Sequence, residues 1–499
     1  MERWQVVTVV VAGYLLLTLL IGLFAGRRVS ASVAGYVAAD RQFGLLAQYF
    51  VTGAMIFSAF AFLGGPGWAY AQGAAVFYIL SYGVLGIAPW YVLGPKAGRL
   101  GRRLGFVTQA QLVAGRFPSR SLSLLLALLS VAAFVPYIML QMSGAGIVFR
   151  AVTDGHVPFW LGAAVSYLVV LVYVLFGGVA AVGWTNVFQG IIMMSVAWGL
   201  GLYIPIHLYG GVGAMFERIA DARPELLTLP GLNAGGEPWS WGAYSSAILA
   251  SALGFTLWPH LFMKSYTSRD DDTLRRTVIL FPTFQLFLIP IFLVGFAGVL
   301  YPSPPEAPDF IMPHMILQTG LPALVVGLFC AGALSASMST GDALMHAAAS
   351  IAVEDGVRPY VRLTDAQQRL LMRALVVVVG AVAYYFAIVQ KQTLVFLLLT
   401  AYGLVDQLAP PVYAALFWKR ATTPGVLAGL AAGIGADLFF FWQRDLRPFD
   451  LHEGILGALA NTLVLVVVSL FTAPQPEAHA TVYVEPEEEA AGATVEAVA

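Results

Sequence analysis

Residues Gly332–Asp355 read GALSASMSTGDALMHAAASIAVED, an apolar segment with small and hydroxyl side chains spaced along it. The segment continues an apolar stretch that begins near Leu321, so its polar residues are expected within or beside a lipid bilayer. Those residues are Ser335, Ser337, Ser339, Thr340 and Asp342. An unpaired polar group inside a bilayer costs several kcal/mol of free energy. Oxygen ligands and a carboxylate at that depth therefore indicate that an ion or a polar solute passes there. The stretch therefore predicts a membrane transporter with a cation site.

The composition excludes several classes of protein. Hydrophobic residues make up 59% of the chain and charged residues 11%, whereas soluble domains carry about 25% charged residues. The chain has 26 Lys and Arg against 27 Asp and Glu, a balance that argues against a general nucleic-acid-binding role. Cys330 is the only cysteine, so neither an internal disulfide nor a cysteine-based metal site can form.

The apolar segments predict an all-α polytopic membrane protein. A bilayer core about 30 Å thick needs about 20 apolar residues per helix, and thirteen segments meet that criterion. They are residues 6–25, 45–63, 74–94, 122–149, 158–177, 184–208, 243–263, 276–300, 321–346, 371–390, 393–417, 425–443 and 454–472. A signal peptide is the alternative for the first segment. Arg27 and Arg28 follow that segment without a small-residue cleavage site before them, which favours a retained helix.

The distribution of Lys and Arg predicts the orientation in the plasma (inner) membrane, because cytoplasmic loops carry an excess of both. With the N-terminus outside and the C-terminus in the cytoplasm, 19 of the 26 lie on the cytoplasmic side and 7 outside. The cytoplasmic set is Arg27, Arg28, Arg41, Lys96, Arg99, Arg102, Arg103, Arg116, Arg120, Lys264, Arg269, Arg275, Arg276, Arg358, Arg362, Arg369, Arg373, Lys419 and Arg420. Residues 1–473 are expected to form the transmembrane domain. The acidic, Ala-rich residues 474–499 are expected to form a disordered cytoplasmic tail.

Two of the predicted spans contain residues that interrupt helices. Span 45–63 runs into Gly64–Gly67 (GGPG), and span 243–263 contains Pro259. Their separation by five spans predicts two inverted five-helix repeats, at about 45–208 and 243–417. Transporters built from such repeats bind substrate where two discontinuous helices meet, because freed backbone groups supply ligands. An ordinary proline kink is the alternative for each break.

Four motifs resemble those of the sodium:solute symporter family, which includes bacterial proline, sugar, sialate, pantothenate and monocarboxylate carriers. They are GGVAAVGWTNVFQG (Gly177–Gly190), LWPHLFMKSY (Leu257–Tyr266), ASMSTGDALMHAAAS (Ala336–Ser350) and LAPPVYAALFWKRATTPGVLAG (Leu408–Gly429). The resemblance implies a LeuT-like core of five plus five inverted helices, with one extra helix before it and two after it. The WPH motif and the basic, Asp-rich loop after it are most similar to the monocarboxylate carriers.

The resemblance also implies a sodium site between the first and the eighth core helices. Matched by motif, its ligands are the carbonyl groups of Ala54, Phe57 and Ala336 and the hydroxyls of Ser339 and Thr340. A hard monovalent cation prefers neutral oxygens, and the freed carbonyls of an unwound turn supply them. The alternative is that Ser339 and Thr340 bond to their own helix or to a neighbour.

The chain departs from the family pattern at the WTD motif, where Asn186 replaces the aspartate. In family members with a second sodium, that carboxylate is a ligand together with hydroxyls at positions that are Asp342 and Ala343 here. We therefore expect Asp342 to face Asn186 and to supply the charge that a cation or a proton neutralises. His346 lies one turn further on the same face, so an Asp342–His346 proton relay is an alternative to sodium coupling. A purely structural carboxylate is the other interpretation.

The predicted substrate is a small organic anion, such as a monocarboxylate, imported with Na⁺ by alternating access. No Lys or Arg lies at the midplane of a core span, so an anion would depend on helix N-termini, hydroxyls and the bound cation. Candidates for substrate binding are Ser58, Phe60, Tyr137, Gln141, Thr256, Trp258, Tyr402 and Asp406, with packing as the alternative for each.

Other functions stay open at this stage. Pantothenate, an amino acid or another solute could be the cargo, and H⁺ could be the coupling ion. A channel is disfavoured, because the polar residues cluster at one level and do not line a continuous pore. The sequence offers no nucleophile–base pair, metal-ligand cluster or phosphate-binding loop of an enzyme. Beyond the solute and the bilayer, no nucleic acid and no obligatory protein partner are expected.

Overall fold

Every regular element that the computed structural model describes is a helix, over residues 2–27, 32–389 and 393–485. Arg28 of the predicted cytoplasmic set and residues 486–499 of the predicted tail lie outside the described residues. The α-helices, several of them joined by short 3₁₀ or π-helical turns, are α1 Arg3–Gly26, α2 Val33–Ala38, α3 Leu45–Ile56, α4 Gly65–Gln72, α5 Tyr78–Ile87, α6 Trp90–Leu104, α7 Gln109–Arg116, α8 Arg120–Val152, α9 Phe159–Tyr209, α10 Val212–Ala222, α11 Trp241–Phe255, α12 Pro259–Phe262, α13 Lys264–Thr267, α14 Asp271–Gln285, α15 Leu288–Val299, α16 Ile311–Gln318, α17 Ala323–Ile351, α18 Asp365–Val389, α19 Leu394–Asp406, α20 Ala409–Phe417, α21 Thr423–Trp442, α22 Glu453–Phe471 and α23 Glu477–Val484.

Many of these helices are long and apolar enough to cross a membrane. Among the described residues there are ten such helical segments, three of which join consecutive helices (α4–α5, α14–α15 and α19–α20), or eleven when the bent pair Trp241–Phe255 and Pro259–Thr267 is taken as one span. The number thirteen stays a prediction. The 51-residue α9 would be about 75 Å long if straight, far more than a bilayer needs. Its backbone leaves the helical conformation at Gly178 (φ 54°, ψ −148°), between the predicted spans 158–177 and 184–208.

The break predicted in span 45–63 is present, but it lies earlier than the glycines. α3 ends at Ile56, Phe57 is not helical (φ −87°, ψ 72°), and a π-helical turn leads into α4. The glycines serve close packing instead. A Cβ on Gly65 would lie 2.7 Å from the Phe292 ring, and a Cβ on Gly67 would lie 2.9 Å from a backbone oxygen of the neighbouring loop.

The second predicted break is confirmed at its expected place. α11 ends at Phe255, and the chain bends by 41° before α12 begins at Pro259. Pro259 stands in the first turn of α12, where a helix does not need the missing N–H group. The proline therefore starts the second half of a broken span and does not merely kink a continuous one.

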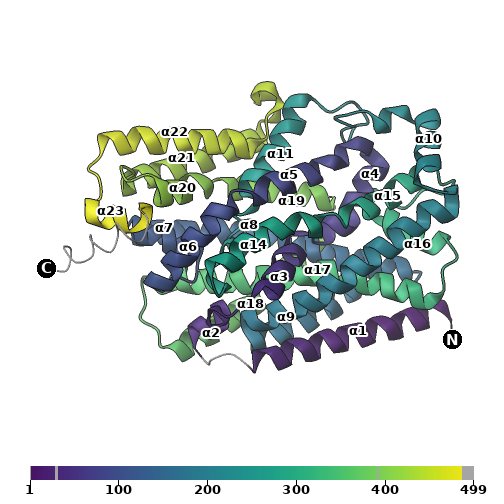
Figure 1. Ribbon diagram of the computed structural model, residues 1–499, viewed down its shortest axis with the longest axis horizontal. Coiled ribbons are helices and arrows are strands. Elements are labelled where there is room, and N and C mark those ends of the chain that lie inside the picture. Colours follow the sequence, from purple (N-terminus) through teal and green to yellow (C-terminus); the bar gives the residue numbers. More distant parts are fainter. Residues whose placement is uncertain (1, 28–31, 390–392, 486–499) are drawn as a thin grey trace.

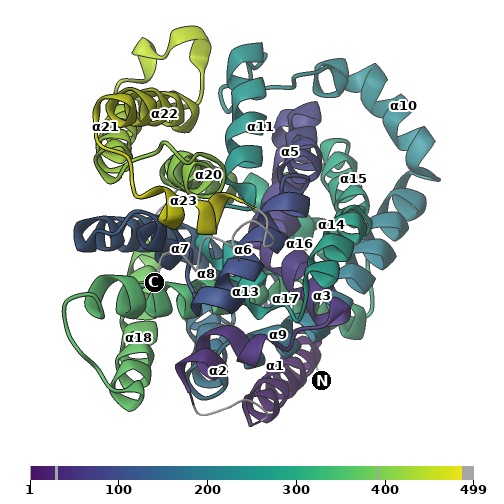
Figure 2. The ribbon, with the colours of Figure 1, turned by 60° about the vertical axis from the view of Figure 1, so that its left-hand side comes forward.

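The stretch Gly332–Asp355 lies in the centre of the bundle. Its helix, α17, packs against α1, α3, α8 and α9, and Figures 1 and 2 show it among these helices. Every residue from Cys330 to Ile351 is buried. The hairpin of α21 and α22 and the helix α18 lie at the periphery (Figure 2). The polar side chains of α17 must therefore find their partners inside the protein.

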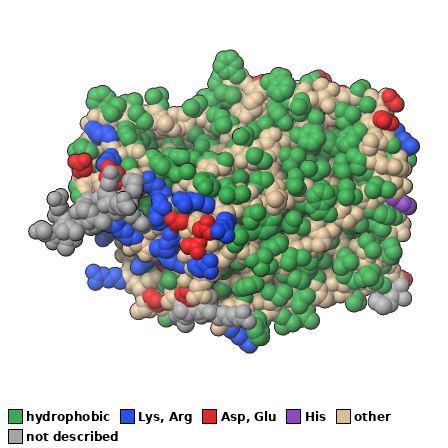
Figure 3. Space-filling model, viewed as in Figure 1, with side chains coloured by type: hydrophobic (Ala, Val, Ile, Leu, Met, Phe, Trp, Pro, Cys, Tyr) green, Lys and Arg blue, Asp and Glu red, His purple; other side chains and the backbone are tan. Residues whose placement is uncertain are grey.

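Charge is distributed unevenly along the molecule. The start of α1 and the end of α23 lie at opposite ends of its long axis (Figure 1), and Lys and Arg gather at the end that carries α23 (Figure 3). Hydrophobic side chains cover most of the rest of that face (Figure 3). Two predicted loop cations are in fact buried, Arg116 at 0% and Lys264 at 5% exposure. Arg116 donates to Lys419 O (2.9 Å), and Lys264 is the first residue of α13, the short helix that follows α12.

The tail predicted to be disordered is a helix over Glu477–Val484. Lys96 Nζ donates to Val484 O (2.8 Å), a ring nitrogen of His479 hydrogen-bonds Arg116 O (3.2 Å), and Tyr483 is buried. The acidic composition that suggested disorder belongs mainly to the residues beyond this helix. The apolar side chains of this helix were the feature of the sequence that indicated packing against the protein.

Candidate cation and substrate sites

The helix break after α3 frees two backbone carbonyl groups that face α17. In an α-helix, the carbonyl of residue i accepts from the N–H of residue i+4. The Ser58 N–H donates to Ile56 O (3.0 Å) and not to Ala54 O. The Ala59 N–H donates to a glutamine side chain of α8 (3.1 Å) and not to Met55 O. The carbonyl groups of Ala54 and Met55 are therefore left without their helical partners.

The hydroxyls of Ser339 and Thr340 reach these two carbonyls from α17. Ser339 Oγ donates to Ala54 O (2.8 Å), and Thr340 Oγ1 donates to Met55 O (2.9 Å). The carbonyl oxygen of Ala336 lies 3.3 Å from Ser339 Oγ. All five residues are fully buried. Five neutral oxygens from two helices thus meet in the interior.

Four of the five predicted cation ligands take part in this arrangement: Ala54, Ala336, Ser339 and Thr340. The fifth, Phe57, does not accept from the hydroxyl pair, and Met55 accepts from Thr340 instead. The Phe57 carbonyl also lacks its helical partner, because the Ala61 N–H donates to Ser58 O (2.9 Å).

Asp342 lies one turn further along α17 with its carboxylate enclosed by α9. Its Oδ2 accepts from the Tyr173 hydroxyl (2.7 Å) and from the Thr185 hydroxyl (3.3 Å). Its Oδ1 is buried and has no hydrogen-bond partner among the described residues. Asn186 lies at the same interface, but its side-chain amide donates to Ser339 O (3.1 Å). The neighbour Thr185, not Asn186, makes the direct contact with Asp342.

His346 and Asp342 have separate hydrogen-bond partners. A ring nitrogen of His346 lies 2.9 Å from Tyr36 O, and its ring packs against the Tyr36 ring with centroids 5.1 Å apart. The buried ammonium of Lys264 lies near enough to interact electrostatically with both Asp342 and His346. Lys264 is thus part of the environment of Asp342, a role that its predicted place in a loop concealed.

Three of the predicted substrate residues, Tyr137, Trp258 and Tyr402, meet in one aromatic cluster that also contains Tyr82 and His260. The Trp258 ring centroid lies 4.9 Å from that of Tyr137, 5.7 Å from that of His260 and 5.6 Å from that of Tyr402. Tyr82 completes the cluster, 6.2 Å from Tyr402. These side chains come from α5, α8, the α11–α12 break, α12 and α19, so the cluster borders one broken span directly.

The remaining substrate candidates are distributed around this cluster. Phe60 reaches it through Tyr78, with ring centroids 6.5 Å apart. Ser58 Oγ accepts from the Phe60 N–H (3.2 Å). Gln141 accepts the Ala59 N–H through Oε1, and its Nε2 has no partner among the described residues. Thr256 is buried in the α11–α12 break.

Asp406 lies one turn beyond Tyr402, and both side chains border Gly254 of α11. A Cβ on Gly254 would stand 2.9 Å from its Oδ1, and a Cβ on Gly454 would stand 2.6 Å from its Oδ2. Its carboxylate is therefore held between α11 and α22. Both oxygens are buried without a hydrogen-bond partner in the described part of the chain.

His260 and Tyr78 were not among the predicted substrate residues. Both ring nitrogens of His260 and the Tyr78 hydroxyl are buried without partners among residues 2–27, 32–389 and 393–485. The signal for His260 was its place directly after Pro259, at the break itself.

The sequence profile of the sodium:solute symporter family matches residues 36–433, a range that contains every residue of the candidate cation site. The chain is a member of the sodium:solute symporter family. Proteins of this family and its solved structural neighbours are transporters, so this symporter is a transport protein and not an enzyme.

Curated relatives match the symporter over nearly its full length. A symporter named YhjB from Bacillus subtilis is 31% identical over 483 residues, which cover 93% of this chain and 96% of that protein. A protein named monocarboxylate transport permease from Rhizobium johnstonii is 26% identical over 449 residues, covering 86% and 88%. Other relatives are named for proline or pantothenate.

A solved structure confirms the fold. A Na⁺-coupled sialic acid symporter in a substrate-bound, outward-open state superposes with a TM-score of 0.79, covering 95% of this chain and 99% of that one. At 18% sequence identity this similarity concerns the fold and not the cargo.

Proposed function

We propose that this symporter couples the inward movement of Na⁺ to the import of a small organic anion, with a monocarboxylate as the best candidate. The observation that carries the proposal is the meeting of the Ser339 and Thr340 hydroxyls with the freed carbonyls of Ala54 and Met55. Membership of a sodium:solute symporter family supports Na⁺ as the coupling ion.

The oxygens at this position suit a sodium ion. All are neutral and buried, and each hydroxyl now donates its proton to a carbonyl. When these protons turn away, hydroxyl and carbonyl lone pairs become available together to one cation. Because the ligands come from α3 and α17, ion binding would hold the two helices together. A state of the cycle in which they are apart would then bind Na⁺ weakly, which is what coupling requires.

The side chains around the aromatic cluster support an anionic cargo. His260, Tyr78 and the Gln141 amide provide hydrogen-bond donors without partners among the described residues. A carboxylate accepts such donors, and its short apolar part would pack against the aromatic rings. The relative named as a monocarboxylate transport permease points to the same class of cargo. Relatives named for pantothenate and proline make those solutes the alternatives.

Asp342 supports proton coupling as a second candidate. Its carboxylate is fully buried and has one unpartnered oxygen, so that a proton could bind there while Tyr173 donates to the other oxygen. Under this alternative, Asp342→Asn would abolish accumulation driven by a proton gradient. Unchanged rate and unchanged cation dependence in that variant would remove Asp342 from the mechanism.

We further infer thirteen membrane crossings with the N-terminus outside and the C-terminus in the cytoplasm, the two extra C-terminal helices being α21 and α22. The start of α1 and the end of α23 lie at opposite ends of the molecule (Figure 1), which supports an odd number of crossings. The inverted repeats are supported by the broken spans, α3–α4 and α11–α12, which occupy the first position of each predicted repeat.

Uptake into proteoliposomes tests the proposal. The purified protein is reconstituted and supplied with radiolabelled acetate, pyruvate, lactate, pantothenate or proline under an imposed Na⁺ or H⁺ gradient. Accumulation of a monocarboxylate under the Na⁺ gradient alone is expected. Accumulation under the H⁺ gradient alone would transfer the proposal to the Asp342 alternative. Substrate-independent single-channel currents would contradict both.

A further inference from the structure

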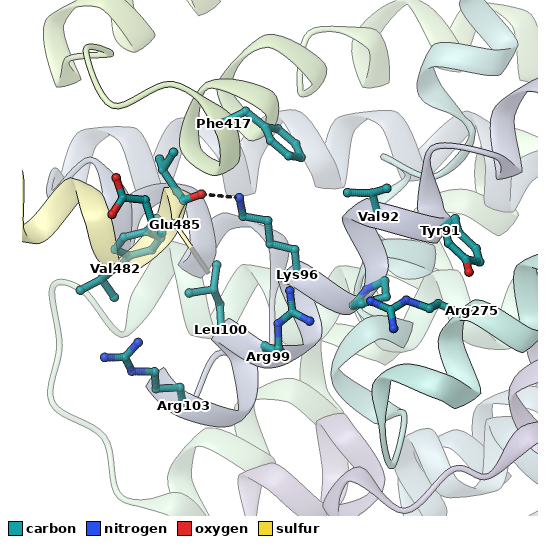
Figure 4. A pocket seen from close by; sticks show the side chains of 13 residues that line it. Tyr91, Val92, Lys96, Arg99, Leu100, Arg103, Arg275, Phe417, Val482 and Glu485 are labelled. Carbon is teal, nitrogen blue, oxygen red and sulfur yellow. Dashed lines mark hydrogen bonds between the residues drawn. The ribbon is translucent and has the colours of Figure 1, made fainter. Parts of the chain in front are cut away.

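A cavity of about 340 Å³ lies at the cationic end of the molecule, between α6, α14, α20 and the C-terminal helix α23. Figure 4 shows Lys96, Arg99 and Arg103 of α6 and Arg275 of α14 along one side of it, with Glu485 opposite. We refer to this space as the cationic cavity. It is separate from the cation and aromatic sites described above and shares no residue with them.

The acidic groups around the cationic cavity are already engaged with cations. Asp271 bonds both Arg99 (2.8 Å) and Arg102. Glu485 is paired with Lys419. Lys96, Arg99, Arg103 and Arg275 therefore line the cavity, and Glu485, the one carboxylate among its described lining residues, is itself in an ion pair.

Lys96 and Arg275 lie against uncharged groups. Lys96 Nζ donates to the backbone oxygen of Val484 (2.8 Å, dashed in Figure 4) and lies 4.5 Å from the centroid of the Phe417 ring. The Arg275 guanidinium lies 5.8 Å from the centroid of the Tyr91 ring. Neither Lys96 nor Arg275 is paired with a carboxylate among the described residues. Both positive charges would therefore stabilise an anion bound in the cavity.

The cavity is also bordered by apolar side chains that face outward. Tyr91, Val92 and Phe417 are 45%, 57% and 44% exposed. Hydrophobic side chains cover most of the face seen in Figure 3, beside the region where Lys and Arg gather. An occupant of this position would contact cations with one end and the apolar surface with the other.

We propose that the cationic cavity binds the phosphate headgroup of an anionic phospholipid, with its acyl chains against Val92 and Phe417. The shared chemistry of a phosphate group would also fit free inorganic phosphate. The apolar border favours the lipid, because free phosphate would leave that border unused. Each juxtamembrane Lys or Arg strengthens binding to an anionic lipid surface, and a cavity that holds four concentrates this effect on one headgroup. Because Val484 and Glu485 line the cavity, the bound headgroup would lie next to the end of α23.

Thermal unfolding of the full chain in detergent micelles, with increasing phosphatidylglycerol, tests the proposal. The wild type is expected to show a saturable rise in melting temperature that phosphatidylcholine does not reproduce. In Lys96→Gln/Arg275→Gln, the half-saturating phosphatidylglycerol concentration is expected to rise about 10-fold or more. The matched control is Arg362→Gln/Arg369→Gln, which removes the same charge outside the cavity, from one exposed and one partly buried position of the predicted cytoplasmic set. It is expected to behave like the wild type.

Two outcomes would overturn the proposal. One is that both double variants, or neither of them, lose affinity for phosphatidylglycerol. The lipid effect would then not depend on the cations of the cavity in particular. The other is an equal temperature rise with inorganic phosphate, which would assign the site to a soluble anion. Arg275→Gln alone changes an exposed position and serves if the cavity double variant does not fold. Native mass spectrometry of the same samples should show fewer retained phosphatidylglycerol molecules in the cavity variant than in the control variant.

Discussion

At the scale of single residues, Ser339 and Thr340 matter because the carbonyls opposite them have lost their helical hydrogen bonds. A hydroxyl that only bonded back to its own helix would be replaceable. Here each hydroxyl joins α17 to α3. We therefore predict that Ser339→Ala or Thr340→Ala raises the Na⁺ concentration for half-maximal uptake about 10-fold, equivalent to about 1.4 kcal/mol of lost ion binding. The double variant should lose gradient-driven accumulation.

Two further variants give this prediction its controls. Thr340→Ser keeps the hydroxyl and should keep most of the Na⁺ affinity. Ser350→Ala, on the same helix, removes a hydroxyl that donates only to His346 O (2.8 Å), and its Na⁺ dependence should not change. Intact accumulation by the Ser339/Thr340 double variant, with wild-type Na⁺ dependence, would refute the candidate cation site.

The motif predicted the hydroxyl residues of this site but not all of its carbonyls. Side chains are written in the sequence, whereas the choice between Met55 and Phe57 depends on the backbone torsion angles at Phe57. The same limit explains why Thr185 and not Asn186 contacts Asp342. Neighbours on a helix point about 100° apart, and a helix rotation of that size cannot be read from one sequence.

At the scale of elements, the two breaks differ in how well the sequence predicted them. Pro259 fixes the start of α12 because it has no N–H to donate, and the prediction was right there. Gly64–Gly67 offers flexibility but does not require a break. The tight approaches of Gly65 and Gly67 to neighbouring segments explain the glycines by packing instead.

Gly178 is the element-scale position with the strictest backbone requirement. Its φ of 54° with ψ of −148° is a conformation for glycine, and a Cβ there would lie 2.6 Å from Tyr36 O. We predict that Gly178→Ala destabilises the protein by about 1–3 kcal/mol and lowers its melting temperature in detergent. Gly199→Ala in the same helix is the control, because no heavy atom lies within 4 Å of its added Cβ. Equal melting temperatures for the two variants would show that the turn at Gly178 tolerates a side chain.

Asp309 links the turn before α16 to the start of α19. Its Oδ2 accepts from the Leu394 N–H (3.1 Å), and burial raises the pKa of this carboxyl to about 6. The folded protein therefore holds a proton that the unfolded chain, with a carboxyl pKa near ~4, has released. Between these pKa values stability falls as the pH rises, and the contribution is fully present only below about pH 4.

We predict the pH dependence of stability that follows from this shift. On acidification from pH 7 to pH 5, the wild type should gain about 1 kcal/mol relative to Asp309→Asn. Asparagine can still accept from the Leu394 N–H but does not titrate in this range. The measurement is the difference in melting temperature between the two proteins at each pH. Parallel curves would mean that Asp309 titrates at the same pH when folded and unfolded.

At the scale of the whole molecule, hydrophobicity and charge predicted the class of protein and the uneven distribution of its cations. The apolar segments predicted a polytopic helical protein, and Lys and Arg do gather at the end that carries α23 (Figure 3). The predictions were wrong where tertiary packing determines whether a side chain is buried. Lys264 and Arg116 were assigned to loops from local sequence, but a helix break and a neighbouring helix end bury them. Long-range contacts of this kind leave no local pattern in the chain.

The orientation of the whole molecule can be tested because Cys330 is the only cysteine and is buried. In a Cys330→Ser background, Glu2→Cys and Glu477→Cys each place one thiol on an exposed position at opposite ends of the protein. With the predicted orientation, a membrane-impermeant maleimide added to intact cells should label Glu2→Cys alone. Glu477→Cys should react only after the membrane is opened, and wild-type-like uptake by both variants is the required control. Labelling of Glu477→Cys in intact cells would reverse the orientation and place the cationic end, with its phospholipid site, on the outside. Labelling of both thiols would instead require an even number of crossings, and would exclude the thirteen-span topology itself.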